Sequence, residues 1–381
     1  MKIAHIADAH WGLGYPGPNP ISRFDDITRV MDWSAGKIIE SECDLVLFAG
    51  DAFKDAKVYL DRAKDEIQAF TSWLRELSDA GIQVVAISGT PSHDAVAAYE
   101  LIREMNIPRV RIVTRPSLVP ISTQKGDVAI ACIPGLNRSQ IVTKEQMRNL
   151  TPREIHQVMT RSLKDLAWGF KAATADILLS HMSLAGADTG FDELLMEHEP
   201  ILTHEAVSPF NLVCLGHIHR PQEISVTDTC KAFYCGSPER LSFNDEAVTP
   251  GFYIHDTDKK ESQFIETPAR HFITFKGDPN IFDAQAYADD AIIRCLFKMT
   301  EEEAAQFDRK AYEKSLYESG AFFVSEIRLD VLKTGRARDE GVTESLAPVE
   351  AVGRWGISME IPPEKIEQLQ AKTTTLLEEV V

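Results

Sequence analysis

The sequence has none of the segments that direct a chain into or across a membrane. It begins directly with a strand-like pattern rather than with a basic stretch followed by an apolar one, so a secretory signal is not expected. No apolar run approaches about 18 residues, the length of a membrane-spanning helix. Low-complexity tracts and internal repeats are also absent. We therefore expect neither a secreted nor a membrane protein.

Cysteine is scarce and follows no pattern. The six cysteines contain no C-x-x-C pair and no regular framework, which argues against a disulfide-stapled fold. Cys43, Cys132 and Cys214 lie in or beside apolar strand-like segments, where a buried free thiol is expected. This usage is typical of a reducing compartment, so we expect a cytoplasmic protein.

Basic residues are outnumbered by acidic ones. The chain has 40 Lys and Arg against 58 Asp and Glu, a formal net charge of −18. Because non-specific DNA affinity comes from cations that neutralise phosphates, this balance argues against a free-standing non-specific DNA binder. It does not exclude a metal-dependent nuclease. Some of the carboxylates would be metal ligands, and a local basic patch or a partner protein could provide the affinity for DNA.

The 381 residues suffice for two or three domains, and an apolar content of 44% supports a sizeable core. Residues 1–268 alternate apolar strand runs with helical stretches, as in an α/β layered domain. Residues 269–361 have the pattern strand, charged helix, strand, which predicts a small separate cap domain. Residues 362–381 predict a C-terminal helix, whose apolar stripe would either bind a partner or pack on the body of the protein.

Several elements can be placed within residues 1–268. Helices are expected at 26–41 and at 60–77, the second from apolar residues that recur at three- and four-residue steps. A third helix begins at Thr151-Pro152-Arg153-Glu154, a capping box with proline at the first helical position. Three later strands lack long helices between them, which predicts an antiparallel addition to the sheet at 222–226, 231–235 and 251–256.

Polar side chains follow apolar runs at five places along the chain. Five of the eleven histidines and two aspartates occupy such positions: Asp8, His10, Asp51, His93, His181, His217 and His219. Because parallel strands end at the same edge, these side chains would converge at one edge of one parallel sheet. A lone D-x-H or H-x-H is a weak signal. The ordered series D-x-H, G-D, H-D, H and G-H-x-H, each after its own apolar run, predicts a shared site.

These residue types suit a centre for two divalent cations. Two cations about 3.5–4 Å apart can activate a water, polarise a phosphodiester and stabilise the leaving oxygen. Such a centre needs a carboxylate between the ions, for which Asp51 is the candidate. It also needs imidazoles, which fill the remaining positions without adding negative charge. Mixed nitrogen and oxygen ligands favour manganese, zinc or iron over calcium.

The chain resembles the calcineurin-type metallophosphoesterases and, more closely, the SbcD-type nuclease subunits of the DNA double-strand-break repair complex. Four motifs carry this resemblance: 6–12 (IADAHWG), 50–53 (GDAF), 180–181 (SH) and 215–219 (LGHIH). The segment 234–243 (YCGSPERLSF) resembles the one that follows the last ligand in these nucleases and separates them from generic phosphatases. The resemblance covers about residues 1–260, and the cap only by position and length.

The resemblance implies an α/β fold: a layered metallophosphoesterase sandwich with mixed sheets, a small α+β cap domain that binds DNA, and a C-terminal helix. The implied ligands are, for one cation, Asp8, His10, Asp51 and His219, and for the other, Asp51, His181 and His217. His93 would be the catalytic imidazole, with Asp94 orienting it. The implied activity is a manganese-dependent exonuclease on duplex ends and endonuclease on single strands or hairpins, acting in DNA break repair or recombination.

The chain departs from this family at the third motif. The family has Gly-Asn-His-Asp, with the asparagine carbonyl on the second cation, whereas residues 89–94 are GTPSHD, without the asparagine and with two residues inserted. Three interpretations stay open: Ser92 ligates directly, water fills the position, or Thr90 reaches in from the longer loop. Because no charged ligand is missing, an active site is still expected.

Lysine and arginine side chains near the expected site loops are candidates for contacts with substrate phosphates. Lys54 and Arg240 are the expected substrate-binding residues; the others are Arg23, Lys57, Arg62, Arg220, Arg336 and Arg338. Trp11 would either stack on a base or line the cleft, or else pack in the core. The histidines without ligand context are expected to be structural or on the surface: His5, His156, His198, His204, His255 and His271.

The resemblance also implies partners. Such nucleases form homodimers through helices near the third motif, here 60–77 and 95–105. They work with an SbcC-type coiled-coil ATPase that docks on a C-terminal helical segment, and the 18 residues after Pro363 are few for that dock. Two other functions are compatible with the same residues: a phosphodiesterase or phosphatase for small nucleotides, and a non-catalytic scaffold with the same fold.

Overall fold

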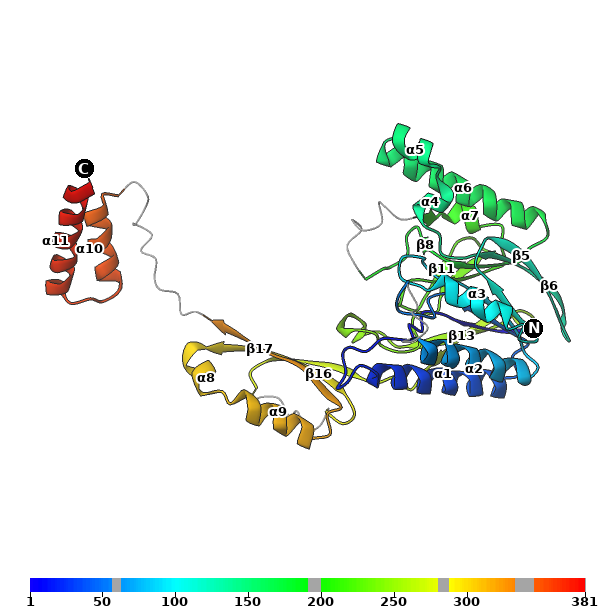
Figure 1. Ribbon diagram of the computed structural model, residues 1–381, viewed down its shortest axis with the longest axis horizontal. Helices are drawn as coiled ribbons and strands as arrows, with labels where there is room; N and C mark the ends of the chain where they lie inside the picture. Colours follow the sequence, from blue (N-terminus) through cyan, green and yellow to red (C-terminus); the bar gives the residue numbers. More distant parts are fainter. Residues whose placement is uncertain (57–62, 191–199, 280–287, 333–345, 381) are drawn as a thin grey trace. The chain divides into compact units, whose positions relative to one another are not determined.

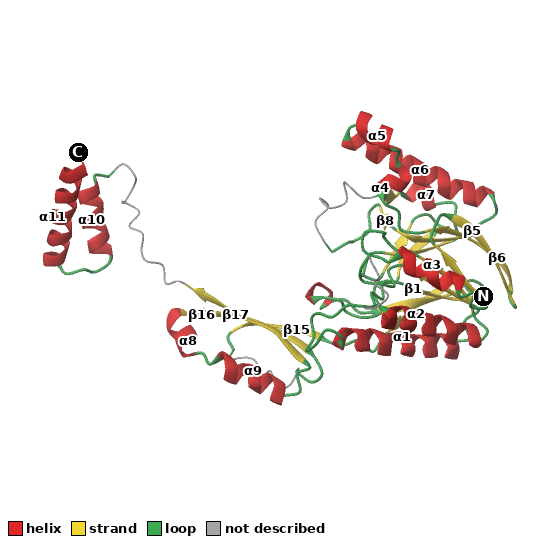
Figure 2. Cartoon of the chain, in the orientation of Figure 1, coloured by secondary structure: helices red, strands yellow, loops and turns green. Residues whose placement is uncertain are grey.

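The computed structural model of the chain describes residues 1–56, 63–190, 200–279, 288–332 and 346–380 (Figures 1 and 2). The chain forms two compact units. The first comprises Met1–Thr274, Ala284–Arg294 and Ser315–Ser325, and the second comprises Phe275–Asp283, Cys295–Lys314 and Glu326–Val381. None of the helices within the described residues is both long and apolar enough to cross a membrane.

The first unit contains a six-stranded sheet in the order β14-β13-β1-β2-β3-β4. Strands β1 to β4 are parallel, and β13 and β14 extend the sheet in antiparallel pairing. The strands are β1 Lys2–Ile6, β2 Leu45–Ala49, β3 Gln83–Ile87, β4 Val110–Val113, β13 Gly251–Asp256 and β14 Glu261–Glu266. The parallel strands are nearly continuous apolar runs because both of their faces are covered.

A second six-stranded sheet has the order β11-β12-β10-β7-β6-β5. Strands β6, β7, β10 and β12 are parallel, and β5 and β11 are antiparallel edge strands. The strands are β5 Ser117–Thr123, β6 Gly126–Ile133, β7 Ile177–His181, β10 Leu212–Gly216, β11 Gln222–Ser225 and β12 Lys231–Tyr234. A small parallel pair, β8 Ser183–Leu184 and β9 Ile201–Leu202, lies apart from these sheets.

Three apolar cores separate four layers, with helices outside both sheets (Figure 1). The first core joins the first sheet to α1 Ser22–Glu40, α2 Lys64–Asp79 and α3 Val96–Glu104. The second lies between the sheets and contains Leu47 and Leu179. The third joins the second sheet to α6 Pro152–Ala172 and to α7 His204–Val207. Two short helices, α4 Arg138–Ile141 and α5 Lys144–Asn149, precede α6. This layering confirms the predicted sandwich.

The helix expected after Thr151 is confirmed, together with its capping box. The Thr151 side chain accepts from the backbone N–H of Glu154, and the Glu154 carboxylate accepts from the backbone N–H of Thr151 at 2.8 Å. These bonds satisfy N–H groups that no helical turn can reach. The helix expected at 26–41 begins four residues earlier, at Ser22. The helix expected at 60–77 corresponds to α2, and its first residues, 60–62, lie outside the described part of the chain.

Two expectations about the sheets were wrong. The converging residues belong to two sheets rather than to one, because β7 and β10 face β1 to β3 across the central core. The three later strands do not form one antiparallel addition either. Strand β12 pairs in parallel with β10, with β11 returning outside it, and only β13 is antiparallel to the first sheet.

A three-stranded sheet has the order β15-β16-β17. The strands are β15 Phe272–Gly277, β16 Ile292–Thr300 and β17 Phe323–Leu332. The single charged helix expected between the last two strands is divided into α8 Glu301–Gln306 and α9 Arg309–Glu318. The candidate DNA contacts Arg336 and Arg338 lie outside the described residues.

The described C-terminal part of the second unit is a pair of helices, α10 Pro348–Ser358 and α11 Pro363–Val380. They contact each other: Gln370 Nε2 donates to Val349 O at 3.1 Å, and the Ile366 side chain lies against Gly356. The predicted boundary between residues 361 and 362 therefore falls between two packed helices. Large apolar side chains remain exposed on this pair: Trp355, Ile357, Leu369, Leu376 and Leu377.

Candidate metal centre

The predicted ligands and His93 converge where strands of both sheets end. Asp8 and His10 follow β1, Asp51 follows β2, and His93 lies on the loop after β3. From the other sheet, His181 ends β7 at its pairing with Gly216, the last residue of β10. His217 and His219 follow directly. The carboxyl ends of parallel strands thus supply the site, as in other α/β proteins.

Asp51 lies at the centre of the group. Its Oδ1 is 3.3 Å from His181 Nε2, and its Oδ2 is 3.5 Å from His93 Nε2 and 3.7 Å from His10 Nε2. One carboxylate therefore faces imidazoles from three different strand ends. Such a position suits a carboxylate that bridges two cations.

Asp8 follows a strand of the first sheet and contacts residues at the strand ends of the second sheet. Both of its carboxylate oxygens accept from the backbone N–H of His217, at 3.0 and 3.1 Å, and Oδ1 lies 4.0 Å from His181 Nδ1. Two three-residue groups have ligand atoms close enough to hold one ion each: Asp8 with His10 and His219, and Asp8 with Asp51 and His181. Asp8 belongs to both groups, whereas the resemblance places it on one cation only.

The backbone is strained at four of these positions. Asp8, His10, Asp51 and His217 have φ values of 56°, 52°, 52° and 94°. Residues other than glycine seldom adopt this left-handed region, and such conformations cluster at functional sites because the surrounding structure holds them there. The strain points to side-chain placement that folding alone does not require.

Two glycines allow the ring of His181 to pack against the neighbouring strand ends. A Cβ on Gly50 would lie 2.5 Å from His181 Nδ1, and Gly50 has a φ of +92°. A Cβ on Gly216 would lie 2.1 Å from Ala49 O. The glycines before Asp51 and His217 in the sequence motifs are thus explained by close approach.

The donor atoms fit a cation. His181 Nδ1 donates to Ala49 O at 2.7 Å, so Nε2, 3.3 Å from an Asp51 oxygen, is the nitrogen left to hold either a proton or a metal ion. Likewise, His10 Nε2 and His219 Nε2 face each other at 3.2 Å. Lone pairs that face acceptors at such distances repel each other unless a proton or a metal ion lies between them. The arrangement is therefore suited to divalent cations.

Electrostatics agrees with this fit. Burial lowers the pKa of His10 to about 3 and also lowers that of His219, so both rings are neutral, as metal ligands must be. Burial also opposes a charge on His181, but Asp51 and Asp8 outweigh it and raise the pKa of that ring to about 10. Without a metal, a proton on His181 neutralises the paired carboxylates. A bound cation would take over this role and release the proton.

The loop after β3 places its residues differently from the expectation. His93 Nδ1 lies 3.1 Å from Ser92 Oγ. Asp94 instead accepts from four backbone N–H groups, those of Gly89 at 2.6 Å, Ala95 at 3.0 Å, and Asp51 and Phe53 at 3.1 Å. The expected role of Asp94, orienting the His93 ring, was therefore wrong. Asp94 fixes the backbone around Asp51, and Ser92 is the residue beside His93.

A cleft of about 400 Å³ opens beside the centre. His181, His217, Thr90 and Ser92 line it from the predicted site. Four further residues, from the loop after β6 and from α4 and α5, complete one wall: Asn137, Arg138, Ser139 and Met147. Sequence reasoning missed these residues. The rule that located His181 would have found Asn137, because β6 is parallel to β7 and ends at the same edge.

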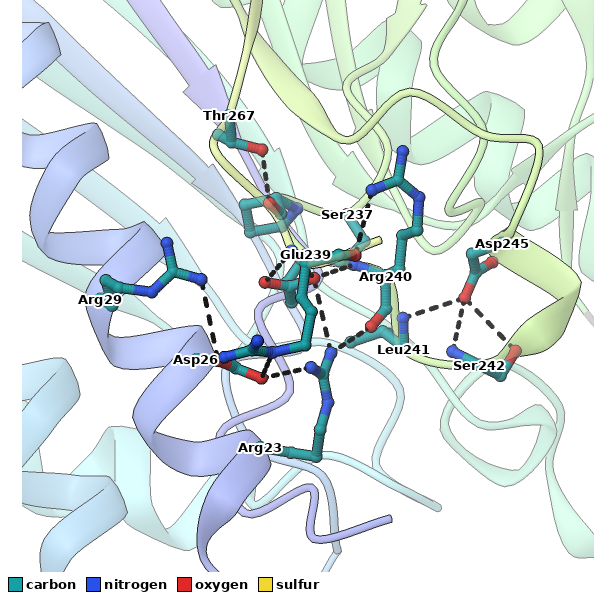
Figure 3. A network of polar contacts seen from close by, with 12 residues as sticks. Arg23, Asp26, Arg29, Ser237, Glu239, Arg240, Leu241, Ser242, Asp245 and Thr267 are labelled. Carbon is teal, nitrogen blue, oxygen red and sulfur yellow. Dashed lines mark hydrogen bonds and ion pairs between the residues drawn. The ribbon is translucent and has the colours of Figure 1, made fainter. Parts of the chain in front are cut away.

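Arg240, expected to bind substrate, lies in a buried polar network (Figure 3). Its Nη1 donates to Arg270 O at 3.1 Å, and its own carbonyl accepts from the Arg23 guanidinium. It does not line the cleft beside His181. Arg23 is fully buried, so it is not available to a phosphate. The network instead supports the centre, because Ser237 Oγ donates to Asp8 O at 2.9 Å.

The other residues that were candidates to contact the substrate differ in their exposure and partners. Lys54 is exposed, and its backbone N–H donates to Trp11 O at 3.0 Å. Trp11 packs in the core, with Nε1 donating to Thr28 Oγ1, so it cannot stack on a base. Arg220 pairs with Asp188 at 2.6 Å. Lys57 and Arg62 lie outside the described residues.

A pH effect is expected from Glu66, which is half-buried beside Gly12. Burial, and then the Asp55 and Asp65 carboxylates, raise the pKa of Glu66 to about 7. Because this folded-state pKa exceeds the unfolded value of about 4.3, the folded state loses stability as pH rises between them. We expect Glu66→Gln to be more stable than wild type at pH 8 by about 1 kcal/mol after allowance for solvent screening. At pH 4.5 the two should be equal.

Urea unfolding at both pH values measures this difference. Glu104→Gln, which changes an exposed carboxylate at the end of α3, should shift stability at neither pH. An equal effect of Glu66→Gln at both pH values would show that the side chain does not titrate between them.

Comparisons with known proteins found a matching family, a relative and similar solved structures. Residues 1–221 match the calcineurin-like phosphoesterase family. Over 306 residues the chain is 29% identical to the SbcD component of the nuclease SbcCD of Bacillus subtilis (strain 168), and the match covers 76% of each chain. Among solved structures, TT1561 of Thermus thermophilus gives a TM-score of 0.42 at 13% identity, covering 70% of this chain and 98% of that one. A dimetal phosphatase from Danio rerio gives 0.38 at 11% identity, covering 67% and 91%.

The family match spans more than half of the chain and includes every position of the predicted metal ligands. The strand ends in that region bring carboxylates and imidazoles together around Asp51. The chain therefore belongs to the calcineurin-like phosphoesterase family.

Proposed function

We propose that the protein is a metal-dependent nuclease that hydrolyses phosphodiester bonds of DNA. The observation that carries this proposal is the position of Asp51, within 3.7 Å of ring nitrogens from three strand ends. Similarity to a nuclease component over 76% of the chain supports a nucleic-acid substrate. Manganese is the proposed metal because the donors mix imidazole nitrogen with carboxylate oxygen.

The chain's residues would hold the cations and orient the substrate. Two divalent cations, when bound, would activate a water and polarise the phosphodiester. Asp51 lies where a shared carboxylate is needed, and Asp8, His10, His181, His217 and His219 are the further proposed ligands. The four backbone N–H groups on Asp94 join the loop of Asp51 to the loop after β3, which would hold Asp51 and His93 in place relative to each other.

His93 is the proposed catalytic imidazole. Its side chain is 43% exposed, whereas that of His181 is fully buried, so it can reach a substrate oxygen. From its position at Asp51, the ring would hydrogen-bond or protonate the leaving oxygen. Ser92 Oγ, 3.1 Å from Nδ1, would hold the ring in that orientation. We therefore favour Ser92 as a positioning residue and water at the position of the family's asparagine.

Phosphate contacts are assigned to the cleft wall. Arg138 lines the same cleft as His181 and His217 and is the cation that we propose to bind the substrate backbone. The exposed Lys54 is a second candidate. A DNA-binding role of residues 269–361 stays a prediction, as does the cytoplasmic location.

We propose two surfaces that bind partner proteins, because each has exposed apolar side chains. Leu101 and Met105 are exposed at the end of α3, within one segment expected to form a homodimer. The exposed apolar residues of α10 and α11 suit an SbcC-type coiled-coil ATPase. These helices together offer a longer dock than the 18 residues that follow Pro363.

Nuclease assays test the proposal directly. Purified protein with manganese should degrade a linear duplex and cleave single strands or hairpins, and Asp51→Asn should lose both activities. Cleavage of a small phosphodiester with DNA left intact would instead favour a nucleotide phosphodiesterase or phosphatase. If neither substrate is cleaved and manganese does not raise the melting temperature, the protein is a scaffold with the family fold, because ligands of the folded state raise its stability.

A further inference from the structure

A second group of metal-ligating side chains lies between the two sheets. One ring nitrogen each of His5 and His255 and the thiol of Cys214 lie within 4.8 Å of one another. The residues come from β1, β13 and β10, so both sheets contribute. His5 and Cys214 precede Asp8 and His217 by three residues along the chain, a distance of roughly 10 Å in extended backbone. The group is therefore separate from the candidate metal centre.

Each imidazole in this group uses one nitrogen and leaves the other without a partner. His5 Nε2 lies 3.1 Å from Leu215 O, and His255 Nδ1 lies 2.8 Å from Ser262 Oγ. His5 Nδ1 and His255 Nε2 are buried and have no hydrogen-bond partner in the described part of the chain. A buried polar atom without a partner costs about 1–3 kcal/mol. The two atoms belong to rings that each have a nitrogen within 4.8 Å of the Cys214 thiol.

The hydrogen bonds resemble those around metal-bound histidines. A histidine that binds a metal through one nitrogen usually donates its other N–H to a carbonyl, a carboxylate or water. The Leu215 carbonyl is such an acceptor for His5, and the Ser262 hydroxyl fixes the ring of His255 in the same way. Burial also lowers the pKa of His255 to about 3 and lowers that of His5, which keeps both rings neutral. Neutral imidazole is the form that binds metal.

We propose that His5, His255 and Cys214 bind a zinc-like cation that joins the two sheets. Two imidazoles and a thiolate select soft or borderline ions such as zinc and cobalt, and disfavour manganese. The Cys214 thiol would lose its proton to the solvent when the ion binds. A fourth ligand would complete a tetrahedron, and the Cys235 thiol, 4.0 Å from the same Leu215 oxygen, is a neighbouring group of suitable chemistry. Because the ion holds β1, β10 and β13 together, its role would be structural.

Cobalt absorption tests this proposal separately from the nuclease proposal. A thiolate bound to cobalt gives a charge-transfer band in the near ultraviolet, which the proposed centre at Asp51 cannot give because its donors are oxygen and nitrogen. Wild-type protein titrated with cobalt should develop this band to a plateau that corresponds to one thiolate-bound cobalt per chain, whatever further cobalt the centre at Asp51 binds. His5→Gln should lose it, since glutamine keeps a donor for Leu215 O but lacks the ligand nitrogen, and Cys214→Ala should lose it as well.

The control is Cys132→Ala, a buried cysteine of the same inter-sheet core, which should keep the band. Circular dichroism checks that each variant is folded. The wild-type titration needs no variant and decides the question by itself: no thiolate band would overturn the proposal. A band that persists in folded Cys214→Ala would also overturn it. Nuclease activity in manganese is read on the same preparations, so the failure of one proposal is distinguished from the failure of the other.

Discussion

Replacement of His93 by alanine is expected to lower the turnover of a phosphodiester by about 10²–10⁴-fold, the range that general acid–base catalysis contributes. The ring lies 3.5 Å from Asp51 Oδ2 and is partly open to solvent. Because His93 is not a proposed ligand, manganese should raise the melting temperature of the variant as much as that of wild type. Steady-state kinetics on a defined oligonucleotide and thermal melting measure the two effects.

Two further variants control this experiment. His271→Ala removes another exposed imidazole and should leave turnover unchanged. Ser92→Ala removes the hydroxyl beside His93 Nδ1, and it should lower kcat without lowering manganese affinity if Ser92 positions the ring. A loss of manganese affinity would make Ser92 a ligand. Normal turnover in His93→Ala would exclude the imidazole from the reaction.

Arg23→Met is expected to destabilise the protein by about 3 kcal/mol, at the lower end of the range for breaking a buried ion pair. The Arg23 guanidinium donates to Asp26 and to Arg240 O and lies 3.4 Å from Glu239 (Figure 3). Methionine would fill much of the space but leave Glu239 without its nearby cation. Asp26 would keep the salt bridge to Arg270, which is why the loss is not larger. Urea unfolding gives the free energy.

Arg29→Met is a matched control on the same helix. Arg29 pairs with the same Asp26 carboxylate at 3.7 Å, but its side chain is 47% exposed. An exposed ion pair contributes about 0–1 kcal/mol, so this variant should lose at most that much. Equal losses in the two variants would contradict the assignment of the network to buried electrostatics.

The convergence of the proposed metal ligands could be predicted from the sequence because each one follows an apolar run. The apolar pattern of a sequence shows where a buried strand ends. Because parallel strands end at the same edge of a sheet, it also shows where the next polar side chain lies. The glycines before Asp51 and His217 also had a readable cause, since only glycine allows the approach to His181. The resemblance implied a sandwich of sheets, but the apolar pattern alone could not assign each strand to its sheet, because buried strands look alike in either sheet.

The roles of single polar residues were harder to predict. Asp94 and Arg240 lie beside motif residues, yet their side chains bond to backbone groups of other segments. Such partners are distant in sequence and leave no local pattern. The same holds for His5 and His255, which had no ligand context along the chain but meet Cys214 across the sheets.

Anomalous scattering from manganese-soaked crystals tests the two-cation centre most directly. The expected result is two manganese peaks about 3.5–4 Å apart, with an Asp51 oxygen between them and Asp8, His181 and the His217–His219 pair around them. The same maps identify the atom that stands at the position of the family's missing asparagine. Crystals that show no manganese between Asp8 and Asp51, or only one ion bound elsewhere, would contradict the account.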